Sequence, residues 1–283
     1  MNRPAMSTTP MPGPPERPTE PAPALRTAPP EAGFAAPPPV LAIQGVSKAF
    51  GGLQALWDVS FRVEPGEIVG LIGPNGSGKT TLFNVISGFL RPDAGSVRLG
   101  ETELTRLAPH QVARAGIGRT FQIVRPFQGL SVLDNVAAAI LYGTGQGDLR
   151  AARRQAQELL AFVGLAHQQA LPATQLTLSQ KKRLEVAKAL GTSPRVLLLD
   201  EVFAGLNPRE MDEAIALVFR LREHFSLSIL LVEHVTRAVM QTCQRIVVLS
   251  YGQKIAEGTP REIASHPQVL QVYLGVEADA HRP

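Results

Sequence analysis

One segment, Gly73-Pro74-Asn75-Gly76-Ser77-Gly78-Lys79-Thr80, limits what this chain can fold into more than any other part of the sequence. It matches the pattern G-x-x-x-x-G-K-[ST] and lies between the apolar run 68–72, which predicts a strand, and a predicted helix from Lys79 to about Ser87. This order of strand, loop and helix is what a phosphate-binding loop requires. The glycines let backbone N–H groups surround a β-phosphate, Lys79 adds positive charge, and Thr80 offers a hydroxyl to Mg²⁺. The segment, together with Thr81, therefore predicts a site for nucleotide phosphates.

Two carboxylates, Asp200 and Glu201, follow the apolar run 196–199. Carboxylates at the end of a buried strand are costly unless a cation lies nearby. Asp200 is therefore expected to hold Mg²⁺, and Glu201 to polarise an attacking water. The pair is a weak signal by itself and gains weight from the phosphate-binding loop upstream.

His234 and Gln122 are ambiguous when each is taken alone. His234 follows the apolar strand 227–232, so it lies at the carboxyl edge of the predicted sheet, where ligands of open α/β folds bind. A lone histidine in that place more often has a structural role. Gln122, in the stretch Arg119-Thr120-Phe121-Gln122, is equally open to either interpretation.

Short strand-like runs alternate with helical patterns from Leu41 to Leu274, which is typical of an α/β fold with a mostly parallel sheet. Two hairpin-like strands open this region, and a subdomain inserted at about 122–190 is predicted to be mainly helical. A turn is expected at 91–95. The expected strands are 41–46, 56–63, 68–72, 195–199, 228–232 and 245–249, and the expected helices of the subdomain are 133–141, 149–163 and 179–190.

The ends of the chain differ from its middle in composition. Residues 1–39 are rich in proline and alanine and predict a disordered tail, residues 40–275 predict one α/β domain, and residues 276–283 predict a flexible C-terminus. Prolines interrupt every window that a signal peptide would need. No apolar run reaches the ~18 residues that cross a bilayer. The one cysteine, Cys243, is expected to be a small core residue on a helix and fits a reducing compartment.

A net formal charge of +4 does not distinguish an anionic ligand from nucleic acid or a membrane surface. The densest basic cluster, Lys181-Lys182-Arg183, lies on a predicted helix without interleaved aromatic residues. A solvated helix face is the favoured interpretation. A nucleic-acid contact and a local role near phosphates are the alternatives.

Taken in order, these motifs identify a family resemblance. The phosphate-binding loop, Gln122, a modified signature at Leu176-Thr177-Leu178-Ser179-Gln180, Asp200-Glu201, Ala204-Gly205-Leu206-Asn207-Pro208 and His234 resemble the nucleotide-binding subunits of ABC transporters over about 41–275. The resemblance implies a P-loop ABC ATPase with an antiparallel β subdomain and the cofactors ATP and Mg²⁺. It also implies that Phe50 stacks on adenine, that Gln122 senses Mg²⁺ and the γ-phosphate, and that His234 contacts the γ-phosphate. Core packing is the alternative for Phe50, and also for Trp57.

The same resemblance implies several partners. A second ABC ATPase subunit would pair with this chain, and Thr177, Ser179 and Gln180 would complete that partner's nucleotide site. Two membrane permeases and, indirectly, a solute-binding protein would complete the transporter, with this chain peripheral on the cytoplasmic face of the inner membrane. No nucleic-acid partner is expected. The segment 123–133, with Phe127, Leu130 and Val132, is the hypothesised docking surface for a permease helix.

Within the family, the chain most resembles the ATPases of branched-chain amino acid uptake. The segments that carry this likeness are Phe50-Gly51-Gly52-Leu53, Gly118-Arg119-Thr120-Phe121-Gln122, Ala204-Gly205-Leu206-Asn207-Pro208, Gly258-Thr259-Pro260-Arg261-Glu262 and Val272-Tyr273-Leu274-Gly275. Partner subunits choose the cargo, so importers for amides, urea or aromatic acids stay open.

Four positions depart from the general family pattern. Leu178 and Ser179 replace signature glycines, Val202 stands where proline usually follows the catalytic glutamate, and Asn207 replaces an aspartate. These departures keep a catalytically weak partner subunit of a heterodimer as one alternative. A non-transport ABC-type ATPase is a second alternative, although neither a long coiled-coil insertion nor a second cassette is visible in the sequence. A phosphotransferase is a third, although it would not explain the signature stretch and His234 together.

Overall fold

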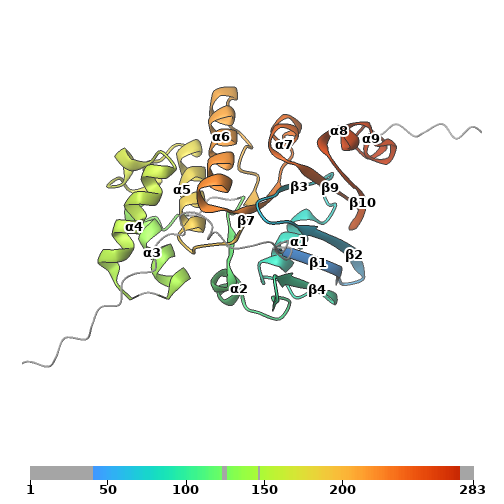
Figure 1. The fold of residues 1–283 in the computed structure, drawn as a ribbon, viewed down its shortest axis with the longest axis horizontal. Helices are drawn as coiled ribbons and strands as arrows, with labels where there is room; N and C mark the ends of the chain where they lie inside the picture. The colour runs from blue at the N-terminus through green and yellow to red at the C-terminus, as the bar shows by residue number, and fades with distance from the viewer. Residues whose placement is uncertain (1–40, 123–125, 146, 275–283) are drawn as a thin grey trace, which may run out of the picture.

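The computed structural model describes residues 41–122, 126–145 and 147–274, so the predicted tails at 1–39 and 276–283 lie outside the described residues. The core is a six-stranded sheet in the order β10-β9-β3-β8-β7-β6 (Figure 1). Strands β9, β3, β8, β7 and β6 are parallel, and β10 pairs antiparallel with β9. The mostly parallel sheet is therefore confirmed. The bounds are β3 Ile68–Ile72, β6 Ile117–Arg119, β7 Val196–Asp200, β8 Ser228–Val232, β9 Arg245–Ser250 and β10 Gln253–Gly258.

Side chains of a strand alternate between the two faces of its sheet. The apolar strands of the core sheet are buried because other elements pack on both of those faces. All five residues of β7 are buried, and its successive side chains enter two different core clusters. Leu197 and Leu199 join the cluster shared with the helical subdomain. Val196 and Leu198 join the cluster shared with α1, Lys79–Ile86, and the second sheet. The carboxyl end of β7, which carries the predicted carboxylates, is thereby held between two layers.

A second, antiparallel sheet has the order β2-β1-β4-β5 and lies below the core sheet in Figure 1. Its strands are β1 Leu41–Phe50, β2 Leu53–Val63, β4 Ala94–Leu99 and β5 Thr102–Glu103. The first two are longer than the sequence predicts, because the pairing continues to a tight turn at Gly51 and Gly52. The turn expected at 91–95 is wrong at its end, since β4 already begins at Ala94.

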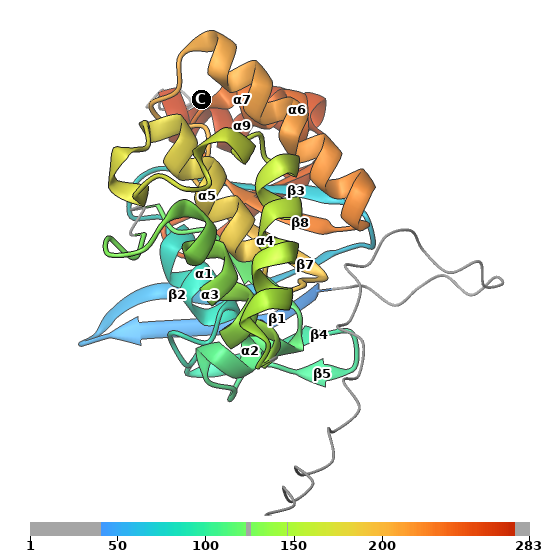
Figure 2. The same ribbon diagram turned by 90° about the vertical axis from the view of Figure 1, so that its left-hand side faces the viewer.

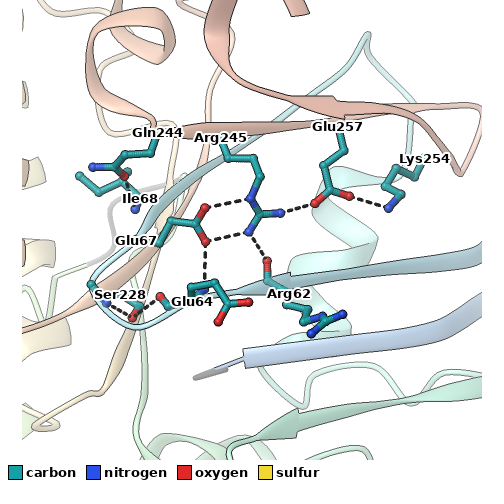
Figure 3. A network of polar contacts seen from close by, with 10 residues as sticks. Arg62, Glu64, Glu67, Ile68, Ser228, Gln244, Arg245, Lys254 and Glu257 are labelled. Carbon is teal, nitrogen blue, oxygen red and sulfur yellow. Dashed lines mark hydrogen bonds and ion pairs between the residues drawn. The ribbon is translucent and has the colours of Figure 1, made fainter. Parts of the chain in front are cut away.

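One arginine ties the second sheet to the core sheet (Figure 3). Arg245 of β9 donates from Nε and Nη2 to the two carboxylate oxygens of Glu67, at 2.8 and 2.7 Å. Its Nη2 also donates to the Arg62 carbonyl oxygen at the end of β2, at 2.8 Å. Glu257 of β10 pairs with Nη1 of the same guanidinium. The bidentate pairing fixes how the two sheets meet, on the side of the core away from the helical subdomain.

Helices α3 Val132–Thr144, α4 Leu149–Phe162 and α5 Leu178–Leu190 form the helical subdomain, which faces the viewer in Figure 2. Each is within a few residues of its predicted bounds. Ser131 and Thr177 begin α3 and α5 by accepting a backbone N–H with their hydroxyl groups, as expected of N-cap residues. The remaining helices are α2 Pro109–Ala115, α6 Pro208–Phe225, α7 Thr236–Thr242, α8 Pro260–Ser265 and α9 Pro267–Leu274, with short 3₁₀ turns at Ala166–Gln168 and Ala173–Gln175.

Several expectations need correction. The cluster Lys181–Arg183 is not a solvated helix face, because Lys182 donates to two backbone carbonyls and Arg183 pairs with Glu213 at 2.6 Å. Cys243 is buried as predicted, but it lies just after α7 and not within a helix. Burial raises the pKa of its thiol to about 12. Within the described part of the chain, no helix combines the length and apolar character that a membrane span needs.

Candidate nucleotide-binding site

The phosphate-binding loop leaves β3 and enters α1 through positions that only glycine fits. A Cβ atom on Gly73 would lie 2.2 Å from the Leu249 carbonyl oxygen, so the loop passes directly against β9. Gly78 adopts a φ of 103° as the N-cap of α1, and a Cβ there would lie 2.6 Å from the Ala55 carbonyl oxygen. These contacts fix the loop between the two sheets, with the N-terminus of α1 directed at the space it encloses.

Lys79 lies folded into this loop. Its Nζ donates to the carbonyl oxygens of Gly73 and Pro74, at 2.8 and 2.9 Å. Burial lowers the pKa of Lys79, while the nearby carboxylates of Glu201 and Asp200 act in the opposite direction. The loop therefore holds a largely dehydrated cation that an anionic phosphate oxygen can pair with.

A cavity of about 490 Å³ lies over the loop, within the size range of small-molecule sites. Phe50 is 46% exposed at the end of β1 and lines this cavity, whereas Trp57 is 60% exposed and does not. Core packing is therefore wrong for both rings. The predicted residues that line the cavity are Phe50, Asn75, Gly76, Ser77, Gly78, Lys79, Thr80, Thr81, Gln122, Glu201 and His234.

Glu201 is the point at which the predicted catalytic residues meet. Its Oε2 accepts a hydrogen bond from Gln122 Nε2 at 2.7 Å, and its Oε1 lies 2.8 Å from His234 Nε2. Glu201 follows β7, His234 comes two residues after β8, and Gln122 comes three residues after β6. Because the carboxyl ends of parallel strands share one edge of the sheet, three distant segments deliver these side chains to one place.

Asp200 is 6% exposed and is held by a residue whose role the sequence did not reveal. Arg119 Nη2 lies 3.2 Å from Asp200 Oδ2, and Arg119 Nη1 donates to Asn84 Oδ1 and Ser87 Oγ at 2.8 and 2.7 Å. Burial raises the pKa of Asp200, and Arg119 counteracts that rise. The sequence carried no clear signal for this pairing, because the strand that places Arg119 beside Asp200, β6, has only three residues.

The residues present fit Mg²⁺. This ion keeps several waters and uses one or two carboxylates together with substrate phosphates. Thr80 and Gln122 line the cavity. Asp200 is the last residue of β7, the strand that pairs with β6. Among the described residues no group of three or more His, Cys, Asp or Glu side chains is placed to hold a metal ion by itself.

The signature residues are separate from this cavity. Thr177 and Gln180 close a capping box at the start of α5, in which Gln180 Oε1 accepts from the Thr177 N–H at 3.0 Å. Neither residue lines the cavity, and Ser179 does not line it either. The structure therefore brings Gln122, Glu201 and His234 together with the loop, and leaves Thr177, Ser179 and Gln180 elsewhere.

Glu233 is a second residue that sequence reasoning missed. It is 1% exposed directly after β8, and one carboxylate oxygen accepts the Phe203 N–H at 2.6 Å. Burial raises the pKa of Glu233 to about 7. A carboxylate that follows a buried strand was the signal used for Asp200, and the same reasoning applied to β8 would have found it.

Two family profiles match the chain. The profile described as ABC transporter matches residues 56–204, and that described as branched-chain amino acid ATP-binding cassette transporter matches residues 253–279. The high-affinity branched-chain amino acid transport ATP-binding protein LivG of Salmonella typhimurium is 41% identical over 250 residues, covering 84% of this chain and 98% of that protein. BraF of Pseudomonas aeruginosa, with the same description, is 39% identical with the same coverage.

Other matches extend beyond amino acid transport. The lipopolysaccharide export system ATP-binding protein LptB of Escherichia coli is 37% identical over 237 residues, covering 83% of this chain and 97% of that protein. Among solved structures, the ADP conformation of an ATP-binding cassette of an ABC transporter superposes with a TM-score of 0.76 at 31% identity. It covers 84% of this chain and 99% of that one. A nucleotide-free cassette gives the same TM-score and identity.

Proposed function

We propose that this chain, which belongs to the ABC transporter family as one of its ATP-hydrolysing subunits, powers the import of branched-chain or related amino acids through membrane permeases. The observation that carries the proposal is the match of its C-terminal residues 253–279 to the branched-chain profile. LivG and BraF, named for branched-chain amino acid transport, are also nearer in identity than LptB, which is named for lipopolysaccharide export.

In the proposed reaction Glu201 orients the attacking water and accepts a proton from it as the general base. Gln122 and His234 hold one oxygen of that carboxylate each, so its plane is set before water enters. Lys79 and the N-terminus of α1 bind the phosphate oxygens. Mg²⁺ held by Thr80, Asp200 and Gln122 would neutralise charge that develops on those oxygens. Phe50, exposed at the mouth of the cavity, offers its ring to adenine.

A second ATPase subunit is required by this proposal. Thr177, Ser179 and Gln180 lie outside the cavity of their own chain, at the exposed N-terminus of α5. A helix N-terminus suits a phosphate, so these residues are available to a second subunit that faces them. Leu178, half exposed beside them, is the large residue that such a partner must accommodate.

The proposed permease contact lies between the core and the helical subdomain. A cavity of about 320 Å³ there is lined by Phe89, Phe121 and Arg119 on one side and by Lys188 of α5 on the other. Phe127 and Leu130 of the hypothesised docking segment are exposed, but Val132 is fully buried in α3 and is removed from that surface. Residues 123–125 of the segment lie outside the described residues. The chain would then act from the cytoplasmic face of the inner membrane, as a peripheral subunit.

The test is solute uptake by cells that lack this chain. Complementation with the wild type and with Lys254→Met, which removes a charge that does not line the cavity, should restore uptake of radiolabelled leucine, isoleucine or valine. Glu201→Gln should leave uptake at least about tenfold lower. If uptake of these amino acids does not depend on the chain while that of an amide or an aromatic acid does, the proposed substrate class is wrong. If no solute is affected, the transport proposal is wrong.

A further inference from the structure

The turn formed by residues 201–204 places Glu201 in a backbone conformation that is unfavourable for glutamate. Glu201 adopts a φ of 51°, in the left-handed region that residues other than glycine avoid. Val202 follows it at the position where a proline would restrict the backbone. The only backbone hydrogen bond described within residues 201–204 joins the Ala204 N–H to the Glu201 carbonyl, at a long 3.4 Å. The turn therefore depends on contacts from other elements.

Lys182 of the signature helix α5 supplies one of these contacts. Its Nζ lies 2.7 Å from the Glu201 carbonyl oxygen and 2.6 Å from the Ala204 carbonyl oxygen. One ammonium group thus bridges both ends of the turn. Hydrogen bonds from a charged donor are short and strong, which suits them to hold a backbone that is unfavourable by itself.

Glu233 supplies the complementary contact from the loop after β8. Its Oε1 accepts the Phe203 N–H at 2.6 Å, between the two carbonyls that Lys182 holds. Its Oε2 accepts the N–H of His234, the residue that contacts the Glu201 side chain. The turn is thus held from two sides by groups from two different elements.

All of these bonds to residues 201–204 end on main-chain atoms. What they fix is the backbone direction from which the Glu201 side chain starts, while Gln122 and His234 hold the carboxylate itself. A lysine that only solubilised a helix would leave its ammonium in water. Lys182 instead gives up hydration, since burial lowers its pKa and the Glu233 and Glu201 charges act against that.

We infer that Lys182 is a positioning residue for ATP hydrolysis, which holds the Glu201 backbone and joins it to the helix that begins with Thr177. The inference rests on the proposed catalytic role of Glu201 and deepens it. Because Lys182 lies one turn after the signature residues, a displacement of α5 by a second subunit's nucleotide reaches the Glu201 turn through this side chain. The signature residues, which would contact the second subunit's nucleotide, are thereby linked to Glu201, the general base for this chain's own nucleotide.

The test uses the full chain, alone and with its permeases, and compares Lys182→Met, Lys182→Arg, Lys254→Met and Glu201→Gln. Methionine keeps the length and apolar character of the stem and removes only the donors. Lys182→Met should lower kcat by about 10- to 100-fold and leave the KM for ATP and the affinity for ADP within about twofold. Lys182→Arg, which retains charged donors, should recover kcat to within about threefold. Lys254→Met should match the wild type.

Each contrary outcome has a distinct meaning. If Lys182→Met turns over ATP like the wild type while Glu201→Gln is inactive, the positioning role of Lys182 is wrong and the proposed function stands. If Lys182→Met loses ADP affinity together with kcat, and Lys182→Arg does not recover it, the residue supports the fold only and the inference is overturned. If Glu201→Gln retains full turnover, the proposed catalytic role of Glu201 fails first.

Discussion

Arg119 and Asp200 form a buried ion pair between neighbouring strands of the core sheet, with Nη2 and Oδ2 3.2 Å apart and both side chains less than 10% exposed. The guanidinium also lies over the Phe121 ring, at 5.0 Å from its centroid. Phe121 belongs to the cavity proposed for permease contact, and Asp200 is the proposed Mg²⁺ ligand. One side chain therefore spans the distance between those two sites.

Removing Arg119 alone should destabilise the chain, because the Asp200 carboxylate would stay buried without its cation. Arg119→Met is expected to lower the free energy of unfolding by roughly 3–5 kcal/mol. Adding Asp200→Asn, which removes the unpaired charge, should recover part of that loss. Urea unfolding of the two single variants and the double variant measures the coupling free energy between Arg119 and Asp200. Strictly additive effects of the two substitutions would contradict an energetic coupling between these residues.

Glu233 should make stability depend on pH. Burial raises its pKa from 4.5 to about 7, so the folded chain binds this proton more tightly than the unfolded chain. The resulting stability is present below about pH 4.5 and is lost as pH rises through 7. Glu233→Gln keeps an acceptor for the Phe203 N–H, gives up the acceptor of the His234 N–H and removes the titration. Relative to the wild type, this variant should therefore gain on the order of 2 kcal/mol between pH 5 and 8.

Thermal or urea unfolding at several pH values between 5 and 8 compares the free energy of unfolding of the wild type with that of Glu233→Gln. Lys182 is the charged neighbour that acts against the rise, and it is unchanged in the variant. A stability difference that stays constant over the whole pH range would show that Glu233 does not titrate in this window.

Two exposed aromatic residues provide a matched pair for adenine binding. Phe50→Ala should weaken ATP binding by about 10-fold or more, as the loss of one base–aromatic stack does. Trp57→Ala should leave the affinity unchanged, because Trp57 does not line the cavity. Isothermal titration with ATP and ADP measures both. Equal losses in the two variants would indicate a general effect on the second sheet and not a stack on Phe50.

The phosphate-binding loop should not tolerate a methyl group at Gly73. The added Cβ would meet backbone, at 2.2 Å from the Leu249 carbonyl oxygen, so β9 or the loop must move. Gly73→Ala is expected to lose nucleotide affinity by at least about 10-fold and to lower the free energy of unfolding by roughly 1–3 kcal/mol. Gly129→Ala is the control, since nothing lies within 4 Å of its added Cβ. A Gly73→Ala variant with wild-type nucleotide affinity would contradict this geometry.

The sequence predicted the parts of the fold that local patterns determine. Buried strands such as Ser228–Val232 are continuous apolar runs, and the loop before α1 has a fixed spacing, so both were placed correctly. Four strands were missed. β5 has two residues and β6 has three, too few for any periodicity, and they exist because neighbouring strands offer them partners. β4 and β10 have six residues each and were missed as well.

The sequence predicted the side chains that line the candidate site, but it did not predict the charged residues that hold the backbone beneath them. Asp200, Glu201 and the loop carry recognisable motifs. Lys182 is part of a basic run that fits a solvated helix face equally well, and only the packing of α5 against the 201–204 turn directs its ammonium inward. The depth at which Glu233 is buried likewise depends on tertiary contacts. Charged residues that support a site through main-chain contacts have no spacing rule that a sequence displays.

We propose that Glu201, held by Gln122 and His234, drives hydrolysis of ATP bound at the loop. The most direct measurement is ATP turnover by the full chain beside Glu201→Gln, with ATP affinity measured on both and the permeases added in a second arm. We expect Glu201→Gln to bind ATP within about twofold of the wild type and to turn it over at least about 100-fold more slowly. Equal turnover by the two proteins, or a wild type that binds ATP and stays inactive even with the permeases, would contradict it.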